Sequence, residues 1–442
     1  MGRRPIDMDK VALDLVLSTS IDEKKKIAKK ITDMAYKNGI YSSSINSLYM
    51  ARGRPEFPGT FTVPAINLRT LAYDLAKAIF RVAKRDNAGA FIFEIAKSEM
   101  GYTDQPPVEY VAVCLAAALK ENWKGPVFIQ GDHFQLNAKN YKENPEKELE
   151  GLKALILKAM EAGFYNIDID SSTLVDLSKP SVKKQQKDNY EVCALLTNFI
   201  RQNQPRGIEV SVGGEIGEVG HQNSTPEDLK AFMEGYKERL RKGRAGISKI
   251  SIQTGTSHGG VVLPDGTIAK VKLDFDTLKN LSKIAREEYG MAGAVQHGAS
   301  TLPAEAFGKF PENSAAEVHL ATEFQNMVYD SAHFPKDLKG LMYDWVKKNC
   351  ASERKQDQTE EQFIYSARKK ALGFFKKEIM GLSAETRNTI ASEIEKKFEF
   401  LFEKLNVRDT RDLTSKYIVL KRVISRKRGP SEHVKLTGEG AD

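Results

Sequence analysis

Three histidines each stand just past a short apolar run: His133 after 127–130, His258 after 247–252 and His297 after 292–296. Such runs are typical of buried parallel strands, and charged or metal-binding residues at the exit of a strand indicate a site. A single histidine in this position is most often an ordinary hydrogen-bonded side chain. Three in matched positions indicate imidazoles that converge with a fourth position open, which is the composition of a catalytic zinc centre.

Carboxylates gather at the same places. Asp132 directly precedes His133, Asp168 and Asp170 stand at the end of another apolar run, and Glu215 follows a third. A carboxylate beside a metal-bound histidine can exchange a proton near neutral pH, because burial and the nearby cation shift its pKa in opposite directions. Asp132 is therefore a candidate acid/base.

Glycines and hydroxyl residues supply a second half of the predicted site. Glycines flank His258, and the segment after His297 reads Gly298-Ala299-Ser300-Thr301. Backbone N–H groups in such turns, just ahead of helices, suit phosphate oxygens. For each glycine taken singly, the alternative is simple turn geometry.

The elements that must position these residues alternate regularly. Amphipathic patterns predict helices between the runs, two of them starting at Pro145 and Pro226 with Asn144 and Thr225 as N-caps. Eight strand–helix units over about 270 residues favour an α/β fold of the (β/α)8 barrel type over an open doubly wound sheet. The predicted strands are 61–66, 89–92, 126–130, 165–169, 208–212, 247–252, 292–296 and 316–320.

The chain divides by pattern into three predicted parts. Residues 1–60 read as a helical preface, 61–330 as the barrel, and 331–442 as a charged helical extension that ends in a basic tail around 421–430. A solvated terminus is the plain interpretation of that tail. An anion contact is the alternative, without any base-reading motif to support it.

Composition narrows the class of protein. The chain has 442 residues, a formal net charge of +8 and three cysteines, too few for a disulfide framework, so we expect a reducing cytoplasm. No apolar run approaches the roughly 20 residues of a membrane helix, and no membrane association is expected. A basic protein can steer anionic substrates such as sugar phosphates. Nucleic acid is not an expected partner, because no zinc-finger, RNA-recognition or basic-zipper pattern is present.

Six short motifs at successive strand ends carry a resemblance to a known family. Together, over roughly residues 60–330, they make the sequence resemble the class II, metal-dependent ketose-bisphosphate aldolases, the fructose- and tagatose-bisphosphate enzymes. Each motif is weak alone, but six in the family's order form a strong signal. They are Gly131-Asp132-His133, Ile169-Asp170-Ser171-Ser172, Gly214-Glu215-Ile216-Gly217, Gly255-Thr256-Ser257-His258-Gly259, His297-Gly298-Ala299-Ser300 and Ala321-Thr322-Glu323.

The resemblance implies a metal centre. His133, His258 and His297 match the family's zinc ligands, and Asp132 matches the acid/base for the C4 hydroxyl of the sugar. Zinc is the expected cofactor, as a Lewis acid that makes a Schiff-base lysine unnecessary. Glu215 and Asp170 match positions that meet a second or displaced divalent metal, and a monovalent cation is a further candidate.

The resemblance also implies a substrate site, with two departures. Gly259, Ser300 and Thr322 match positions that hold the phosphate of the dihydroxyacetone phosphate half. His319 stands where the family usually has asparagine near the enediolate, so it is a candidate for substrate orientation, metal ligation or proton transfer. In register with the family's mobile-loop glutamate this chain has Asn223, and the proton-transfer role is left open between three residues, Glu218, His221 and Glu227.

We therefore predict a zinc-dependent aldolase that reversibly cleaves fructose 1,6-bisphosphate to dihydroxyacetone phosphate and glyceraldehyde 3-phosphate. One alternative is an aldolase for another phosphorylated ketose, such as tagatose bisphosphate or a deoxy- or sulfo-sugar phosphate. Another is a non-catalytic barrel that binds a sugar phosphate. The expected partners are a small sugar phosphate and further copies of this chain in a homo-oligomer.

Overall fold

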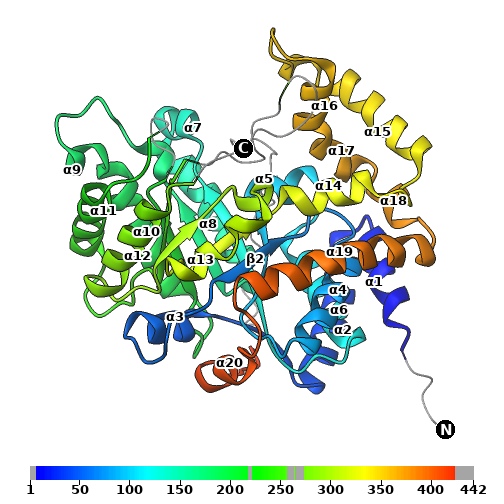
Figure 1. Ribbon diagram of the computed structural model, residues 1–442, viewed down its shortest axis with the longest axis horizontal. Coiled ribbons are helices and arrows are strands. Elements are labelled where there is room, and N and C mark those ends of the chain that lie inside the picture. Colours follow the sequence, from blue (N-terminus) through cyan, green and yellow to red (C-terminus); the bar gives the residue numbers. More distant parts are fainter. Residues whose placement is uncertain (1–5, 218–221, 256–262, 264–272, 424–442) are drawn as a thin grey trace.

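The computed structural model describes residues 6–217, 222–255, 263 and 273–423. At its centre, eight parallel strands, β2 to β9, close into a barrel (Figure 1), because they follow the order β4-β3-β2-β9-β8-β7-β6-β5 and the two end strands, β4 and β5, pair with each other. The predicted α/β class and (β/α)8 architecture are confirmed. The strands are β1 (Ile40–Ser43), β2 (Val63–Asn67), β3 (Ile92–Ala96), β4 (Gly125–Gln135), β5 (Asn166–Asp170), β6 (Ser211–Glu215), β7 (Lys249–Ile252), β8 (Ala294–Gln296) and β9 (Glu317–Leu320).

Helices surround the barrel. Within the described ranges, none combines the length and apolar character that crossing a membrane requires. The helices up to β9 are α1 (Met8–Leu17), α2 (Ile21–Lys37), α3 (Asn46–Gly53), α4 (Ala72–Arg85), α5 (Lys97–Tyr102), α6 (Pro107–Lys120), α7 (Ala138–Glu143), α8 (Pro145–Ala162), η1 (Ser172–Leu174), α9 (Val182–Gln185), α10 (Lys187–Asn203), α11 (Pro226–Arg239), α12 (Phe275–Glu287), η2 (Ala299–Thr301), η3 (Ala304–Ala306) and α13 (Lys309–Glu312). After β9 come α14 (Thr322–Asp330), α15 (Lys336–Asn349), η4 (Ala351–Glu353), α16 (Glu360–Ala367), η5 (Arg368–Lys370), α17 (Ala371–Phe374), α18 (Lys376–Met380), α19 (Ala384–Lys404) and α20 (Arg411–Tyr417).

Two helix starts follow directly from the sequence. The Asn144 side chain accepts a hydrogen bond from the backbone of Lys147, and Thr225 accepts one from Asp228, which bonds back to Thr225. Both helices have proline at the first position, where its missing N–H is no loss. The predicted N-caps are confirmed.

The first 60 residues contain a strand that the helical pattern did not predict. β1 pairs with Gly125–Phe128 of β4, whereas β4 and β5 pair only from Gln130 onward. The backbone N–H of Ile45 donates to Asn166 of β5 at 2.8 Å. β1 therefore fills the gap between β4 and β5 at the amino end of the barrel. The sequence pattern did not predict it, because a strand of four residues is too short to show a period.

The second barrel strand begins later than predicted. The apolar run 88–91 is buried, but the N–H groups of Gly89 and Ala90 donate to the Thr410 hydroxyl, at 3.0 and 3.1 Å, instead of to a neighbouring strand. β3 pairs only from Ile92. The apolar residues of 88–91 correctly indicated a buried segment. They did not indicate a strand, because the hydrogen-bond partner of this backbone is Thr410, near the other end of the described chain.

The segment after β9 covers the barrel at several points. α19 lies along α4, where Arg81 pairs with Glu395 at 2.7 Å, and the N–H of Thr62 donates to Leu405 at 2.9 Å. By contrast, α15, α16 and α17 project from the upper right of the molecule (Figure 1). The division into preface, barrel and extension stays a prediction.

Candidate active site

An irregularity in β4 turns two consecutive side chains toward the barrel interior. Gly131 pairs with Ile167 and Phe134 with Ile169, so three steps along β4 match two along β5. The extra residue makes a β-bulge, in which His133 takes a φ of 39°. On a regular strand neighbouring side chains point to opposite faces, whereas the bulge brings Asp132 and His133 into one site.

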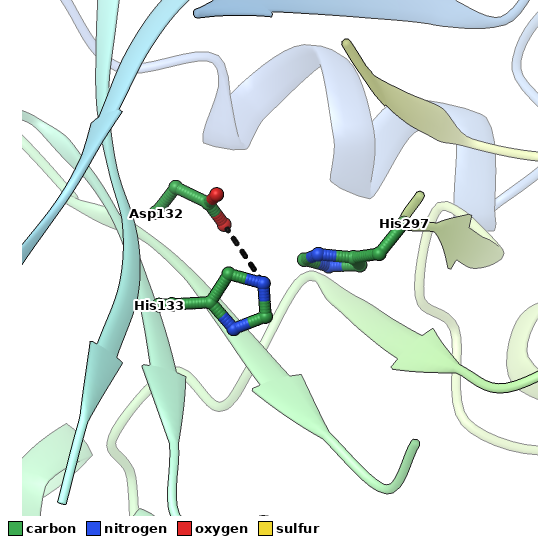
Figure 2. A group of neighbouring side chains, drawn as sticks. All are labelled: Asp132, His133 and His297. Atoms are coloured by element: carbon green, nitrogen blue, oxygen red, sulfur yellow. Dashed lines mark ion pairs between the residues drawn. The ribbon is translucent and has the colours of Figure 1, made fainter. Parts of the chain in front are cut away.

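Figure 2 shows that Asp132 and His133 of β4 face His297, which directly follows β8. The rings of the two histidines lie 4.3 Å apart, and Nε2 of His133 is 3.8 Å from Oδ1 of Asp132. One donor atom from each of the three residues lies within 4.8 Å of the others. Residues far apart in the sequence therefore form one compact donor group at the carboxyl ends of two strands.

Further carboxylates hold these rings in place. Nδ1 of His133 is 3.1 Å from Oδ2 of Asp170, which fixes that ring and leaves Nε2 facing Asp132. Nε2 of His297 lies 2.9 Å from the Ser251 hydroxyl and 3.6 Å from Glu215. Burial alone would lower the pKa of His133, but the carboxylates of Asp132 and Asp170 raise it well above its usual value. Burial and the neighbouring Asp170 raise the pKa of Glu215 to about 8.

His319 joins this group from β9. Its ring lies 4.1 Å from that of His297, and its Nδ1 is 3.1 Å from Oδ1 of Asp132. The same Nδ1 is 3.0 Å from Glu94, and Nε2 is 2.6 Å from Glu317. His319 therefore links the acid/base candidate to carboxylates deeper in the barrel. Its predicted substrate-binding role stays a prediction.

Below His319 the barrel interior is charged. The ammonium group of Lys249 donates to Gln130 at 2.7 Å, to Asp168 at 2.8 Å and to Glu317 at 2.5 Å, and Tyr49 also donates to Glu317. The interiors of barrels of this kind are filled mostly by bulky branched side chains. Here a buried cation with all three N–H groups satisfied stands under the histidines.

Sequence reasoning missed Glu94, Lys249 and Glu317, although a signal was present. Each is a single carboxylate or ammonium group inside a mostly apolar or small-residue run, in 91–96, 247–252 and 315–320. A charge at such a position must be buried and paired if the strand assignment is right. Three such positions in one barrel predict an interior polar network.

The predicted phosphate positions lie at the carboxyl ends of β8 and β9. The Ser300 hydroxyl accepts a hydrogen bond from the backbone of Ala321 at 2.6 Å, which ties η2 to the start of α14. Thr322 is the first residue of α14, and its hydroxyl is 3.4 Å from Arg69. A helix N-terminus with nearby hydroxyls and a guanidinium group suits an anion.

Several predicted residues lie outside the described ranges: Glu218, His221, His258 and Gly259. Of the other candidates for the loop proton carrier, Glu227 is exposed in the first turn of α11. Asn223 is exposed too and donates to Asp274 at 3.0 Å. The identity of the loop acid/base stays a prediction among Glu218, His221 and Glu227.

The donor set fits a divalent transition metal. Two imidazoles and a carboxylate meet at His133, His297 and Asp132, and imidazole with carboxylate suits zinc and its neighbours. Asp170 contacts the Nδ1 of His133 in the arrangement that carboxylates typically adopt beside metal-bound histidines, and its predicted role as a metal ligand stays a prediction. Asp132 is buried, and among the described residues its Oδ1 faces ring nitrogens alone.

This chain is similar to several solved structures. A crystal structure of a probable tagatose 6 phosphate kinase from Sinorhizobium meliloti 1021 shares the fold, with a TM-score of 0.55, 14% identity, and coverage of 80% of this chain and 99% of that one. A fructose-bisphosphate aldolase from Campylobacter jejuni matches with a TM-score of 0.46 and 18% identity, over 84% of this chain and 96% of its own. No curated protein sequence matches this chain.

A family model gives the decisive match. The model described as fructose-bisphosphate aldolase class-II matches residues 58–401, most of the chain. This range includes all six motifs that carried the resemblance, along with Glu94, Lys249 and most of α19. The chain belongs to the class-II fructose-bisphosphate aldolase family.

Proposed function

We propose that this protein is a metal-dependent aldolase that cleaves fructose 1,6-bisphosphate reversibly to dihydroxyacetone phosphate and glyceraldehyde 3-phosphate. Proteins of this family are generally metal-dependent. The observation that carries the proposal is the convergence of Asp132, His133 and His297 at the carboxyl ends of β4 and β8, where barrel enzymes place their chemistry.

His133 and His297 would hold the cation, with His258 as the third expected ligand. When bound, the cation supplies a Lewis acid that polarises the ketone carbonyl of the sugar. Asp132 then accepts the proton of the C4 hydroxyl as the C3–C4 bond breaks, so that C4 becomes the aldehyde carbon. The electron pair of that bond stays with the triose half, and a loop residue returns a proton to C3.

The phosphate of the dihydroxyacetone phosphate half fits the mouth between β8 and β9. Ser300 and Thr322 offer hydroxyls there, and the first turn of α14 directs backbone N–H groups toward the same place. Holding the phosphate at this point positions the sugar chain across the barrel mouth toward the histidines. The binding energy of the phosphate thus orients the reacting carbons.

The test is cleavage of fructose 1,6-bisphosphate by the purified protein, with and without chelator and with zinc added back. We expect activity that is lost to chelator, restored by zinc and absent in His297→Ala. Bound zinc without cleavage of this substrate would transfer the proposal to another ketose phosphate. Absence of both zinc and cleavage would contradict the aldolase proposal and favour a barrel that only binds a sugar phosphate.

A second candidate function is cleavage of a different phosphorylated ketose. The observation that favours it is His319, whose ring reaches Asp132 where the family's asparagine is expected near the substrate. An imidazole beside the candidate acid/base Asp132 changes the space and the hydrogen bonding available to the sugar. Relative kcat/KM values for fructose and tagatose bisphosphates and for singly phosphorylated ketoses separate the two candidates.

A further inference from the structure

Two arginine side chains come together at the amino end of the barrel, on the face opposite the candidate active site. Arg52 belongs to α3 and Arg286 to the last turn of α12, two helices that contact each other at the lower left of Figure 1. Arg52 donates to the carbonyl groups of Phe61 and Ala315, which stand just before β2 and β9. The pair therefore lies where the strands begin.

The two guanidinium groups approach one position beside Gly59. A Cβ atom on residue 59 would stand 3.2 Å from Nε of Arg52 and 3.6 Å from Nη1 of Arg286. Burial, reinforced by the positive charge of Arg286, lowers the pKa of Arg52 to about 10. Two like charges thus share a small space, which is unfavourable unless a negative charge accompanies them.

No carboxylate of the described residues neutralises this pair. Neither Arg52 nor Arg286 takes part in an ion pair among these residues, whereas the neighbouring Arg54 donates from Nε to Glu56 at 2.7 Å. The carbonyl groups that accept from Nη1 and Nη2 of Arg52 are dipoles, so they leave its net charge uncancelled. The Nε atoms of both arginines are buried and, within the same residues, have no hydrogen-bond partner.

A bound anion would remove both unfavourable features. Buried N–H groups without an acceptor and buried charges without a counter-charge each cost free energy. A water molecule supplies an acceptor but no charge. Guanidinium groups are the donors that proteins commonly use to hold oxyanions, because their N–H groups match two oxygens of one ligand.

Such a ligand can reach the arginines from solvent. Arg52 is 2% exposed, but Arg286 and Gly59 are half-buried, and Pro58 and Thr60 on either side of Gly59 are exposed. The guanidinium group of Arg286 can therefore bind an anion directly, while Arg52 adds its charge from the protein side.

The number of charges selects the class of anion. A carboxylate would cancel one of the two positive charges, whereas a phosphate group carries about 1.5 to 2 negative charges near neutral pH. We propose that Arg52 and Arg286 bind a phosphate-type oxyanion beside Gly59, at the amino end of the barrel. The ligand stabilises the junction of α3, α12 and the loop before β2. This site is separate from the phosphate position at Ser300 and Thr322, and it does not depend on the reaction proposed above.

The test compares thermal unfolding of the full-length protein in phosphate and in chloride buffers of equal pH and ionic strength. Inorganic phosphate at about 10-fold to 100-fold above its Kd should raise the unfolding midpoint of the native protein by about 1–3 °C. Arg286→Gln should reduce this gain. Arg54→Gln, which removes an exposed arginine that already has a carboxylate partner, should keep it. Equal gains in the native protein and in Arg286→Gln would overturn the proposal.

Gly59→Asp tests the missing counter-charge directly. This variant places a carboxylate between the two guanidinium groups, so it should raise the midpoint in chloride and reduce the further gain from phosphate. Gly59→Asn has nearly the same shape without the charge and should do neither. Identical behaviour of the two variants would contradict a need for negative charge at this position. If Gly59→Asp fails to fold, the comparison of Arg286→Gln with the native protein still decides.

Equilibrium dialysis with labelled inorganic phosphate separates this site from the proposed substrate site. Arg286→Gln should bind one equivalent less than the native protein, and Ser300→Ala should keep the equivalent that depends on Arg286. Loss of phosphate in Ser300→Ala alone would overturn the site at the amino end and leave the proposed function standing. Loss in Arg286→Gln alone would support the new site and contradict the phosphate position at the barrel mouth.

Discussion

Lys249 is 1% exposed on a strand that lines the barrel, where an ammonium group without partners would be strongly unfavourable. Its contacts with Asp168 and Glu317 make the three side chains stable as a set. We expect Lys249→Met to lower the free energy of unfolding by about 3–5 kcal/mol, because it leaves buried carboxylates without their cation. Urea denaturation measures this loss.

A matched surface pair serves as the control. Lys347 and Glu360 also form an ion pair, at 2.6 Å, but both side chains are at least 40% exposed. Lys347→Met should leave the urea midpoint unchanged, because exposed pairs contribute little. Adding Glu317→Gln to Lys249→Met should recover part of the stability. Equal midpoints for the two lysine variants would contradict a structural role for the interior cation.

The next prediction concerns substrate binding, and it tests the hydroxyl of Ser300. We expect Ser300→Ala to raise KM for the bisphosphate about 10-fold to 100-fold, because a hydrogen bond to a charged group contributes about 1.5–3 kcal/mol. The value of kcat should change little if the hydroxyl binds the phosphate equally before and during reaction. Steady-state kinetics measures both constants.

The control for this variant is Ser178→Ala, which removes an exposed hydroxyl that donates to Asp176 at 2.6 Å. Its KM should match that of the native protein. A fall in kcat with unchanged KM in Ser300→Ala would instead show that the hydroxyl acts on the chemistry, through the start of α14.

At the scale of elements, the bulge in β4 is what places two adjacent side chains in one site, and Gly131 makes it possible. A Cβ atom at residue 131 would run into the ring of Phe134. We expect Gly131→Ala to destabilise the protein by about 1–3 kcal/mol, the usual cost of overpacking. It should also weaken metal binding, because Asp132 and His133 shift with the bulge. Thermal unfolding and metal titration of the same sample measure the two effects.

Gly151 gives the matched glycine control. It lies within α8, and a Cβ atom there would meet nothing within 4 Å. Gly151→Ala should therefore stabilise the protein by about 0.5–1 kcal/mol through helix propensity, without changing metal affinity. If Gly131→Ala behaves like Gly151→Ala, the bulge does not position the metal centre.

Periodic patterns predicted most elements of the barrel, since alternation of apolar runs and amphipathic helices is a local property. The eight strands, the order of units and the caps at Asn144 and Thr225 all followed from it. β1 did not, because four residues are too few for a period. The start of β3 did not, because Thr410 satisfies the preceding backbone from more than 300 residues away.

The residues of the candidate site could be predicted from the sequence, but their contacts could not. Strand-end position identified Asp132, His133, Asp170, Glu215 and His297, which the fold brings together. The bulge was not predictable, because it depends on the register between β4 and β5 rather than on β4 alone. Which carboxylate meets which ring nitrogen likewise depends on three-dimensional placement. The partners of His319 therefore emerged only from the fold.

At the scale of the whole molecule, the region after residue 331 packs on the barrel through side chains that are fully buried. Phe398 of α19 lies 5.1 Å, ring to ring, from Phe324 of α14, the helix whose first residue is the phosphate candidate Thr322. Phe402 lies 5.5 Å from Phe91, just before β3. These contacts connect the last long helix to both the site and the base of the barrel.

This packing predicts that barrel and extension unfold together. We expect Phe398→Ala to cost about 3–5 kcal/mol, as large-to-small changes in a core do, and to lower a single cooperative transition. Calorimetry measures the number of transitions, and Phe374→Ala, at a position 66% exposed on α17, should leave the transition in place. A separate, lower transition in Phe398→Ala with the main one unmoved would show instead that residues 331–442 fold as an independent unit. In that case Phe398→Ala should keep the native KM for fructose 1,6-bisphosphate. Coupled folding predicts instead that this KM rises, because α14, which carries the phosphate candidate Thr322, no longer packs against Phe398.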